Sequence, residues 1–247
     1  MRYFCAALLA AFAASSLAQM EVEKPNLAQP ADETAERAIT PLTCDVNWGT
    51  YCLTAWVDSY GFSVNTTGVF PDPVTFNNAL NSFVNGSGIA GLDIVHARWL
   101  SLQTCLGPNA FECLFIETHL QQIFKTNVTG MDSTVWLITF LEEEYSNGPD
   151  AFKVIRQNYH CAMQVQVHYA SAINQCQATY AIDVQNDPLN VCMYQVFYMT
   201  CLQTIYSQTC STQLGGYVCG EAGIYLRTMN PSCFENPPSS NFCYSLT

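Results

Sequence analysis

VCMYQVFYMTCL, residues 191–202, is apolar on nearly every side of a helix, because only Gln195 and Thr200 are polar. A helix needs about 20 apolar residues to cross a bilayer, so this shorter segment predicts a buried central helix. Asp187-Pro188 lies just before it and is typical of a new helix start. The fold is therefore expected to consist of helices packed around this segment.

The two cysteines of this segment, Cys192 and Cys201, are nine residues apart. On one helix that spacing places them on opposite faces, with a rise of about 13 Å between them. Bridged cysteines need Cα atoms within about 7 Å of each other, so these two cannot pair together. We expect each to link the central helix to a neighbour on a different side.

Twelve cysteines remain once Cys5 is removed with a signal peptide, and this even number favours six intramolecular disulfides. So many cysteines are typical of proteins from oxidising, extracellular compartments. We expect an all-α, disulfide-stapled helical bundle in which the cysteines stabilise the fold and take no part in catalysis. The predicted disulfide residues are Cys44, Cys52, Cys105, Cys113, Cys161, Cys176, Cys192, Cys201, Cys210, Cys219, Cys233 and Cys243.

The pairing in the first half has two equally good solutions. Cys105 and Cys113 flank a Gly-Pro turn and can close it. Alternatively, Cys44 and Cys52 lie on one helix and bridge to Cys113 and Cys105 on an antiparallel neighbour. The spacing alone does not choose between them.

The N-terminus has the pattern of a secretory signal peptide, residues 1–18. Arg2 is followed by an apolar run from Phe4 to Phe12, and Ser16-Leu17-Ala18 predicts cleavage after Ala18. Residues 19–43 are polar and poor in large apolar groups, so we expect a disordered tether. No later segment is long and apolar enough to predict a membrane span.

Three sequons, at Asn65, Asn85 and Asn127, predict N-glycosylation and agree with secretion to the extracellular space. The net charge is −12, and removal of Arg2 makes it −13. An acidic chain of this kind argues against nucleic acid or an anionic membrane as a partner, because both attract basic surfaces.

Residues 44–247 are expected to form one cysteine-rich helical domain, with lobes at 44–147 and 148–247. In the first lobe, Asp72-Pro73 predicts a helix start and Gly107-Pro108 a helix end. Asn109 and Asp132 are predicted N-caps of the next two helices, and Asn147-Gly148-Pro149 ends the second.

In the second lobe the periodicity predicts one long helix from Asp150 to about Tyr180. The alternation over residues 165–169 leaves a short strand as the competing interpretation. After Pro231 the chain is expected to be a loop held by Cys233 and Cys243.

Motifs that carry chemistry are weak in this chain. Residues 86–91 match the dinucleotide-binding pattern Gly-x-Gly-x-x-Gly, but a helical pattern precedes them where the motif requires a strand, so a glycosylated turn is favoured. The acidic run 142–144 is interpreted as a solvated helix face. Four scattered histidines complete no metal or nucleophile motif: His96, His119, His160 and His168. We therefore expect no cofactor, no metal and no enzymatic activity.

Charge is distributed unevenly along the chain. From Gln157 to Gly220 the only formal charges are Asp183 and Asp187, and all three sequons precede Gly130. A charge-poor, tyrosine-rich surface is typical of an interface centre. The second half is therefore expected to self-associate, bind an unknown protein partner or line an apolar ligand cavity. Its exposed positions are expected to be Gln164, Gln166, Gln175, Gln177, Gln195, Gln203, Thr204, Tyr206 and Gln208.

The region from Cys161 to Cys243, with cysteines at nine-residue steps from Cys192 to Cys219, resembles secreted helical domains of nematodes. These include uncharacterised cysteine-rich families and domains of the chondroitin proteoglycan 4 type. The resemblance implies an extracellular, largely non-enzymatic protein. The predicted function is a secreted binding or structural glycoprotein, and the alternative is a carrier that holds a lipid or another apolar ligand between helices.

Overall fold

The structure is a computed structural model that describes residues 44–124, 130–235 and 243–247. The predicted signal peptide, the tether at 19–43 and the sequon at Asn127 lie outside these residues. In the described ranges the chain is helical without strands, which confirms the all-α prediction. None of the helices in these ranges has the length and apolar content that a bilayer crossing requires. The elements are α2 (Val46–Asp58), α3 (Val64–Thr67), α4 (Pro73–Phe111), η1 (Glu112–Phe115), α5 (Glu117–Phe124), α6 (Gly130–Asn147), α7 (Pro149–His168), α8 (Ala170–Asn186), η2 (Pro188–Asn190), α9 (Val191–Thr209), α10 (Thr212–Met229) and α11 (Ser232–Glu235).

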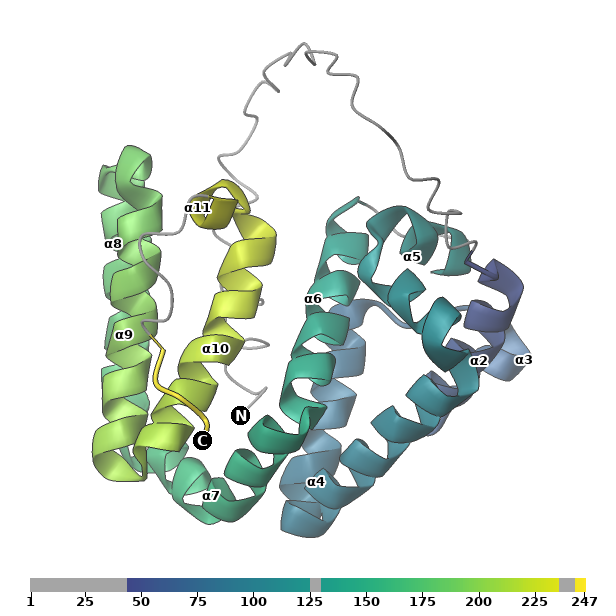
Figure 1. The fold of residues 1–247 in the computed structure, drawn as a ribbon, viewed down its shortest axis with the longest axis horizontal. Helices are drawn as coiled ribbons and strands as arrows, with labels where there is room; N and C mark the ends of the chain where they lie inside the picture. Colours follow the sequence, from purple (N-terminus) through teal and green to yellow (C-terminus); the bar gives the residue numbers. More distant parts are fainter. Residues whose placement is uncertain (1–43, 125–129, 236–242) are drawn as a thin grey trace.

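The helices form two groups, with α2 to α6 in one and α7 to α11 in the other, and Figure 1 shows α8 to α11 beside the first group with α7 between them at the bottom. Each group has its own cluster of buried apolar side chains. Helix α6 contributes to both, because Trp136 and Phe140 face the first cluster while Val135 and Ile138 face the second. The division into lobes at 147/148 stays a prediction.

The first group is built around an aromatic core that α2, α4 and α6 enclose. Two disulfides close it, Cys44–Cys113 and Cys52–Cys105. Of the two pairings that the spacing allowed, the one that joins Cys44 and Cys52 to Cys113 and Cys105 is therefore formed, although Cys44 lies just before α2 and Cys113 lies in η1. Gly107, with φ 69°, bends the chain between the two cysteines of the rejected pair.

Helix boundaries in this group follow the local signals with two exceptions. The Asp72 side chain accepts a hydrogen bond from the Thr75 amide and caps α4, as predicted. Positive φ values at Gly88 and Gly107 interrupt α4, so the glycine pattern at 86–91 contains a break between helical segments. Two predicted caps are wrong: α6 already begins at Gly130, before Asp132, and Asn109 lies within the helical residues after Gly107.

The second group differs from prediction at its first helix. The expected helix from Asp150 to Tyr180 is two helices, α7 and α8, which meet at Tyr169 where φ is −112° and ψ is 15°. The competing strand over 165–169 is also wrong. The alternating residues lie at the end of α7, where Val165 is buried while Val167 is 72% exposed. The break allows α8 to turn and pack along α9.

Four disulfides staple this second group, and Cys192 and Cys201 have different partners, as predicted. Cys176–Cys201 joins α8 to α9, Cys192–Cys233 joins α9 to α11, and Cys161–Cys210 joins α7 to the end of α9. Cys219–Cys243 holds the C-terminal segment on α10. The short helix α11 replaces the start of the loop that was expected after Pro231.

Helix α9 is buried on one side only, so the prediction of a fully buried central helix is wrong. Tyr198, Met199 and Leu202 pack against α8 and α10. On the opposite side Met193 is exposed and Phe197 is 57% exposed. The segment is apolar all round, but neighbouring helices cover only part of its circumference.

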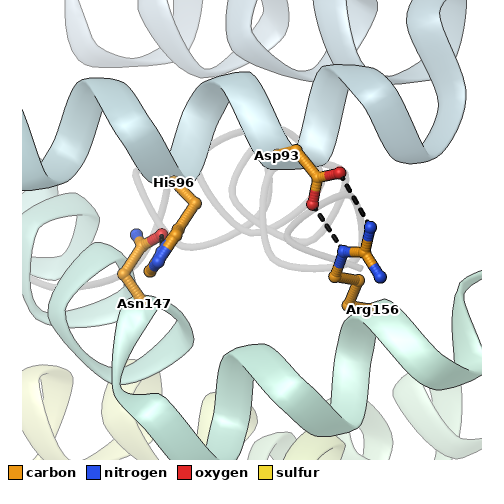
Figure 2. Close-up of polar contacts among 4 residues, drawn as sticks. All are labelled: Asp93, His96, Asn147 and Arg156. Atoms are coloured by element: carbon orange, nitrogen blue, oxygen red, sulfur yellow. Dashed lines mark hydrogen bonds and ion pairs between the residues drawn. The ribbon is translucent and has the colours of Figure 1, made fainter.

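The two groups meet between α6 and α10 and where α4 lies against α7 (Figure 2). His96 Nδ1 lies 2.9 Å from Asn147 Oδ1, and the His96 ring stacks on Phe152 with 3.7 Å between centroids. Arg156 donates two hydrogen bonds to Asp93, of 2.7 and 3.1 Å, and this contact holds the pKa of the Asp93 carboxyl below its usual value. Both contacts link residues far apart in the chain.

Close packing of α9 and α10 depends on Gly215, which gives a first prediction. A Cβ atom there would lie 2.7 Å from the Gln203 carbonyl oxygen and 2.8 Å from the Ser207 Cβ. Gly215→Ala is therefore expected to lower the free energy of unfolding by about 1–3 kcal/mol through overpacking. Urea denaturation followed by circular dichroism measures this change.

Gly86→Ala is the matched control, because a Cβ atom at Gly86 meets no atom within 4 Å and φ is not positive. It also preserves the sequon. Alanine is the better helix former by about 1 kcal/mol, so this variant should be as stable as the parent or slightly more stable. Equal losses in the two variants would contradict the packing argument.

Candidate binding groove

An open groove of about 600 Å³ runs between α8 and α9. Among the described residues, those that line it belong to these two helices, within the charge-poor region noted in the sequence. Most of the surface that lines it is apolar. The lining residues are Ala172, Gln175, Cys176, Thr179, Tyr180 and Asp183 of α8, and Tyr194, Phe197, Tyr198, Thr200, Cys201, Thr204 and Ile205 of α9.

The two walls of the groove are fixed to each other covalently. The Cys176–Cys201 disulfide crosses between the helices, with 6.0 Å between Cα atoms. One turn after Cys176 on α8 and one turn before Cys201 on α9, the rings of Tyr180 and Tyr198 lie 5.4 Å apart. Both tyrosines are buried, and burial raises the pKa of Tyr180. The groove therefore has a rigid, partly aromatic base.

Exposed apolar side chains gather on the same two helices and the turn between them. Phe197 lines the groove and is more than half exposed, while Ile182 and Met193 are also exposed. Leu189, in η2, is 93% exposed. Single exposed apolar residues are normal, but several together beside an apolar groove indicate a surface that binds something.

Among the described residues that line the groove, the one charged side chain, Asp183, lies at one end. Asp183 of α8 lines this end together with Tyr194 of α9. The Tyr194 hydroxyl donates a hydrogen bond of 3.2 Å to Asp187 Oδ2, and the Asn190 amide donates another of 2.7 Å to the same atom. Desolvation raises the pKa of Tyr194, and the charges of Asp187 and Asp183 raise it further.

The structure divides the nine residues that were expected to be exposed into exposed, half-buried and buried ones, and Gln166 and Gln177 are half-buried. Gln164, Gln175, Thr204 and Gln208 are exposed, and two of them line the groove. Gln195, Gln203 and Tyr206 are buried, which corrects the prediction that they are exposed. Gln203, for example, accepts a hydrogen bond from the Tyr244 amide, since the C-terminal segment returns across α9 and α10.

The acidic run 142–144 is a solvated face only at Glu144, which is exposed, and this corrects the sequence interpretation. Glu142 and Glu143 are buried because α6 lies between the two helix groups. Asn147 donates a hydrogen bond of 3.0 Å to Glu143 Oε2. Glu144 accepts hydrogen bonds from Trp99 and Gln103. A run of acidic residues in the sequence does not reveal that a second group of helices covers Glu142 and Glu143.

Other sites in the described residues fit a ligand less well. A small pocket where α4 and α7 meet, lined by residues such as Leu92 and Phe152, measures about 20 Å³ and has room for about one water molecule. A second groove, of about 580 Å³, lies between α10 and the C-terminal segment and has a more polar lining that includes Arg227.

The histidines do not combine with free metal ligands or nucleophiles in the part of the chain that the structure describes. His119 lies beside Cys44 and Cys113, but these two sulfurs are bonded to each other and are not available as thiolates. His96 contacts an amide, Asn147, and its ring faces Phe152. That the protein is not an enzyme stays a prediction.

The two sequons within the described residues, at Asn65 and Asn85, have exposed asparagines. Both lie in the first helix group, far along the chain from α8 and α9. Glycosylation at these sites stays a prediction.

Comparison of the chain with protein-family models, with curated proteins and with solved structures finds no match in any of the three. The resemblance to nematode cysteine-rich domains therefore stays a prediction.

Proposed function

We propose that this protein is a secreted, non-catalytic binding protein that holds an apolar small molecule in the groove between α8 and α9. Secretion is supported by the signal-peptide pattern and by six disulfides, which persist in oxidising compartments. The binding role is supported by an apolar groove with a rigid base on a surface nearly free of charge.

The observation that carries this proposal is the size and lining of the groove. Pockets for small ligands usually measure about 300 to 1,000 Å³ and are mostly apolar, with a few polar groups that orient the ligand. The groove of about 600 Å³ has this size, and Tyr180, Phe197, Tyr198 and Ile205 provide large apolar surfaces. Because a disulfide and packed tyrosines hold the walls of the groove, ligand binding would require little further ordering of the protein.

A neutral fluorescent probe, N-phenyl-1-naphthylamine, tests the proposal on the mature protein. We expect saturable binding with one site per chain. Ala172→Trp should weaken it at least tenfold, because Ala172 is an exposed lining residue and indole would fill one end of the groove. Fluorescence titration measures the affinity, and native mass spectrometry shows whether a small molecule copurifies.

Ala178→Trp is the matched control, since Ala178 is exposed on the same helix but does not line the groove. It should leave the probe affinity unchanged. Absence of saturable binding, or equal weakening by both substitutions, would refute the proposal. Concentration-dependent dimerisation in light scattering, lost in Ala172→Trp, would show that a second copy of the chain occupies the groove instead.

A further inference from the structure

The two acidic residues of the charge-poor region both lie at one end of the groove. No lysine or arginine occurs between Gln157 and Gly220, whereas Asp183 and Asp187 lie within four residues of each other. Asp183 lines the groove itself, and Asp187 reaches its edge through Tyr194. The groove is thus apolar along its length and negative at one end.

These two carboxylates have different surroundings. Asp187 already accepts hydrogen bonds from Tyr194 and Asn190. Asp183 is partly exposed to the groove and acts on Tyr194 through its charge. Neither forms an ion pair with a lysine or arginine in the ranges that the structure describes. Asp183 therefore faces the ligand space without a lysine or arginine of the described ranges paired with it.

Aromatic rings line the groove near Asp183. Tyr194 lies across the groove from it on α9, and Tyr180 is one turn before it on α8. Aromatic faces attract cations, and the attraction is stronger where water is partly excluded. A carboxylate beside aromatic rings favours a cation over a neutral group and repels an anion.

We infer that the groove selects an apolar molecule that carries a protonated amine, with its apolar body along α8 and α9 and its ammonium group beside Asp183. This inference rests on the proposed function, because it names the class of ligand for the same groove. It assigns Asp183 as the residue that determines specificity, through a charge-assisted hydrogen bond to the ammonium group. A fatty acid or another anionic amphiphile would be rejected.

Three naphthalene probes of similar shape test the inference by isothermal titration calorimetry. They are 1-naphthylmethylamine, which is cationic at pH 7, neutral 1-naphthalenemethanol and anionic 1-naphthoate. We expect the amine to bind about tenfold more tightly than the alcohol, and the carboxylate to bind most weakly. Asp183→Asn should weaken amine binding about tenfold and leave the affinity for the alcohol unchanged.

Asp150→Asn is the control, because it removes the same charge from an exposed position on α7 that does not line the groove. It should leave all three affinities unchanged. If the alcohol binds and the amine binds no more tightly, the inference fails while the proposed function stands. If neither binds, both fail. An equal loss of amine affinity in Asp150→Asn would show only a general effect of net charge and would also overturn the inference.

Discussion

Reduction of the disulfides is expected to unfold this protein in the absence of denaturant. In the chain-entropy view a bond that closes a 25-residue loop, such as Cys176–Cys201, contributes about 3.5 kcal/mol, and one that closes a 69-residue loop, such as Cys44–Cys113, about 4.4 kcal/mol. Domains of this size are usually stable by about 5 to 15 kcal/mol. The combined contribution of six such disulfides to the free energy of unfolding exceeds this range.

The loss of helix is measured by far-ultraviolet circular dichroism before and after addition of tris(2-carboxyethyl)phosphine. Alkylation of the mature protein without reductant is the control, and it should label no cysteine because all twelve are paired. A helical spectrum and a cooperative thermal transition that both survive complete reduction would contradict the prediction. They would show that the two apolar clusters suffice to hold the bundle.

Trp136→Ala is expected to have the largest effect of any single core substitution. The indole is 1% exposed, and its ring centroid lies 5.1 Å from Phe76, 4.8 Å from Phe124 and 5.6 Å from Phe140. Truncation removes these contacts and leaves a cavity among the packed aromatic rings. The expected cost is about 3–5 kcal/mol in the free energy of unfolding, measured by urea denaturation.

Trp48→Ala is the matched control, because Trp48 is 46% exposed at the start of α2. Its indole donates a hydrogen bond of 2.8 Å to the Cys105 carbonyl oxygen, so its loss should cost about 1 kcal/mol. Comparable losses in the two variants would mean that the aromatic cluster does not dominate the stability of the first helix group. Tryptophan fluorescence of each variant reports which indole sits in an apolar environment.

Local signals were sufficient at several positions where a structural choice depends on neighbouring residues in the chain, although the caps predicted at Asn109 and Asp132 are wrong. Asp72 caps α4, Gly107 interrupts it, and Asn147-Gly148-Pro149 separates α6 from α7, each through its own backbone preferences. The same holds for the exclusion of a Cys192–Cys201 bond, which follows from helix geometry. The break at Tyr169 lacked such a signal, since no glycine or proline marks it.

The candidate groove was anticipated only in outline. Sparse charge between Gln157 and Gly220 indicated that this half has an unusual surface, but periodicity could not show which face of α9 lies open. Gln195 and Gln203 illustrate the difficulty, because both are polar in sequence and buried in the fold. Whether a side chain is covered depends on helices that arrive from elsewhere in the chain.

The amino-acid sequence by itself determined the helical class, most helix ends and the set of residues able to form bridges, because these depend on backbone preferences and counts within a few residues. Tertiary structure alone decided which cysteines pair, that Glu142 and Glu143 are buried, and that Asp183 lies at the end of an apolar groove. The physical reason is that pairing, desolvation and cavity shape are set by contacts between segments remote in sequence, which local patterns do not encode.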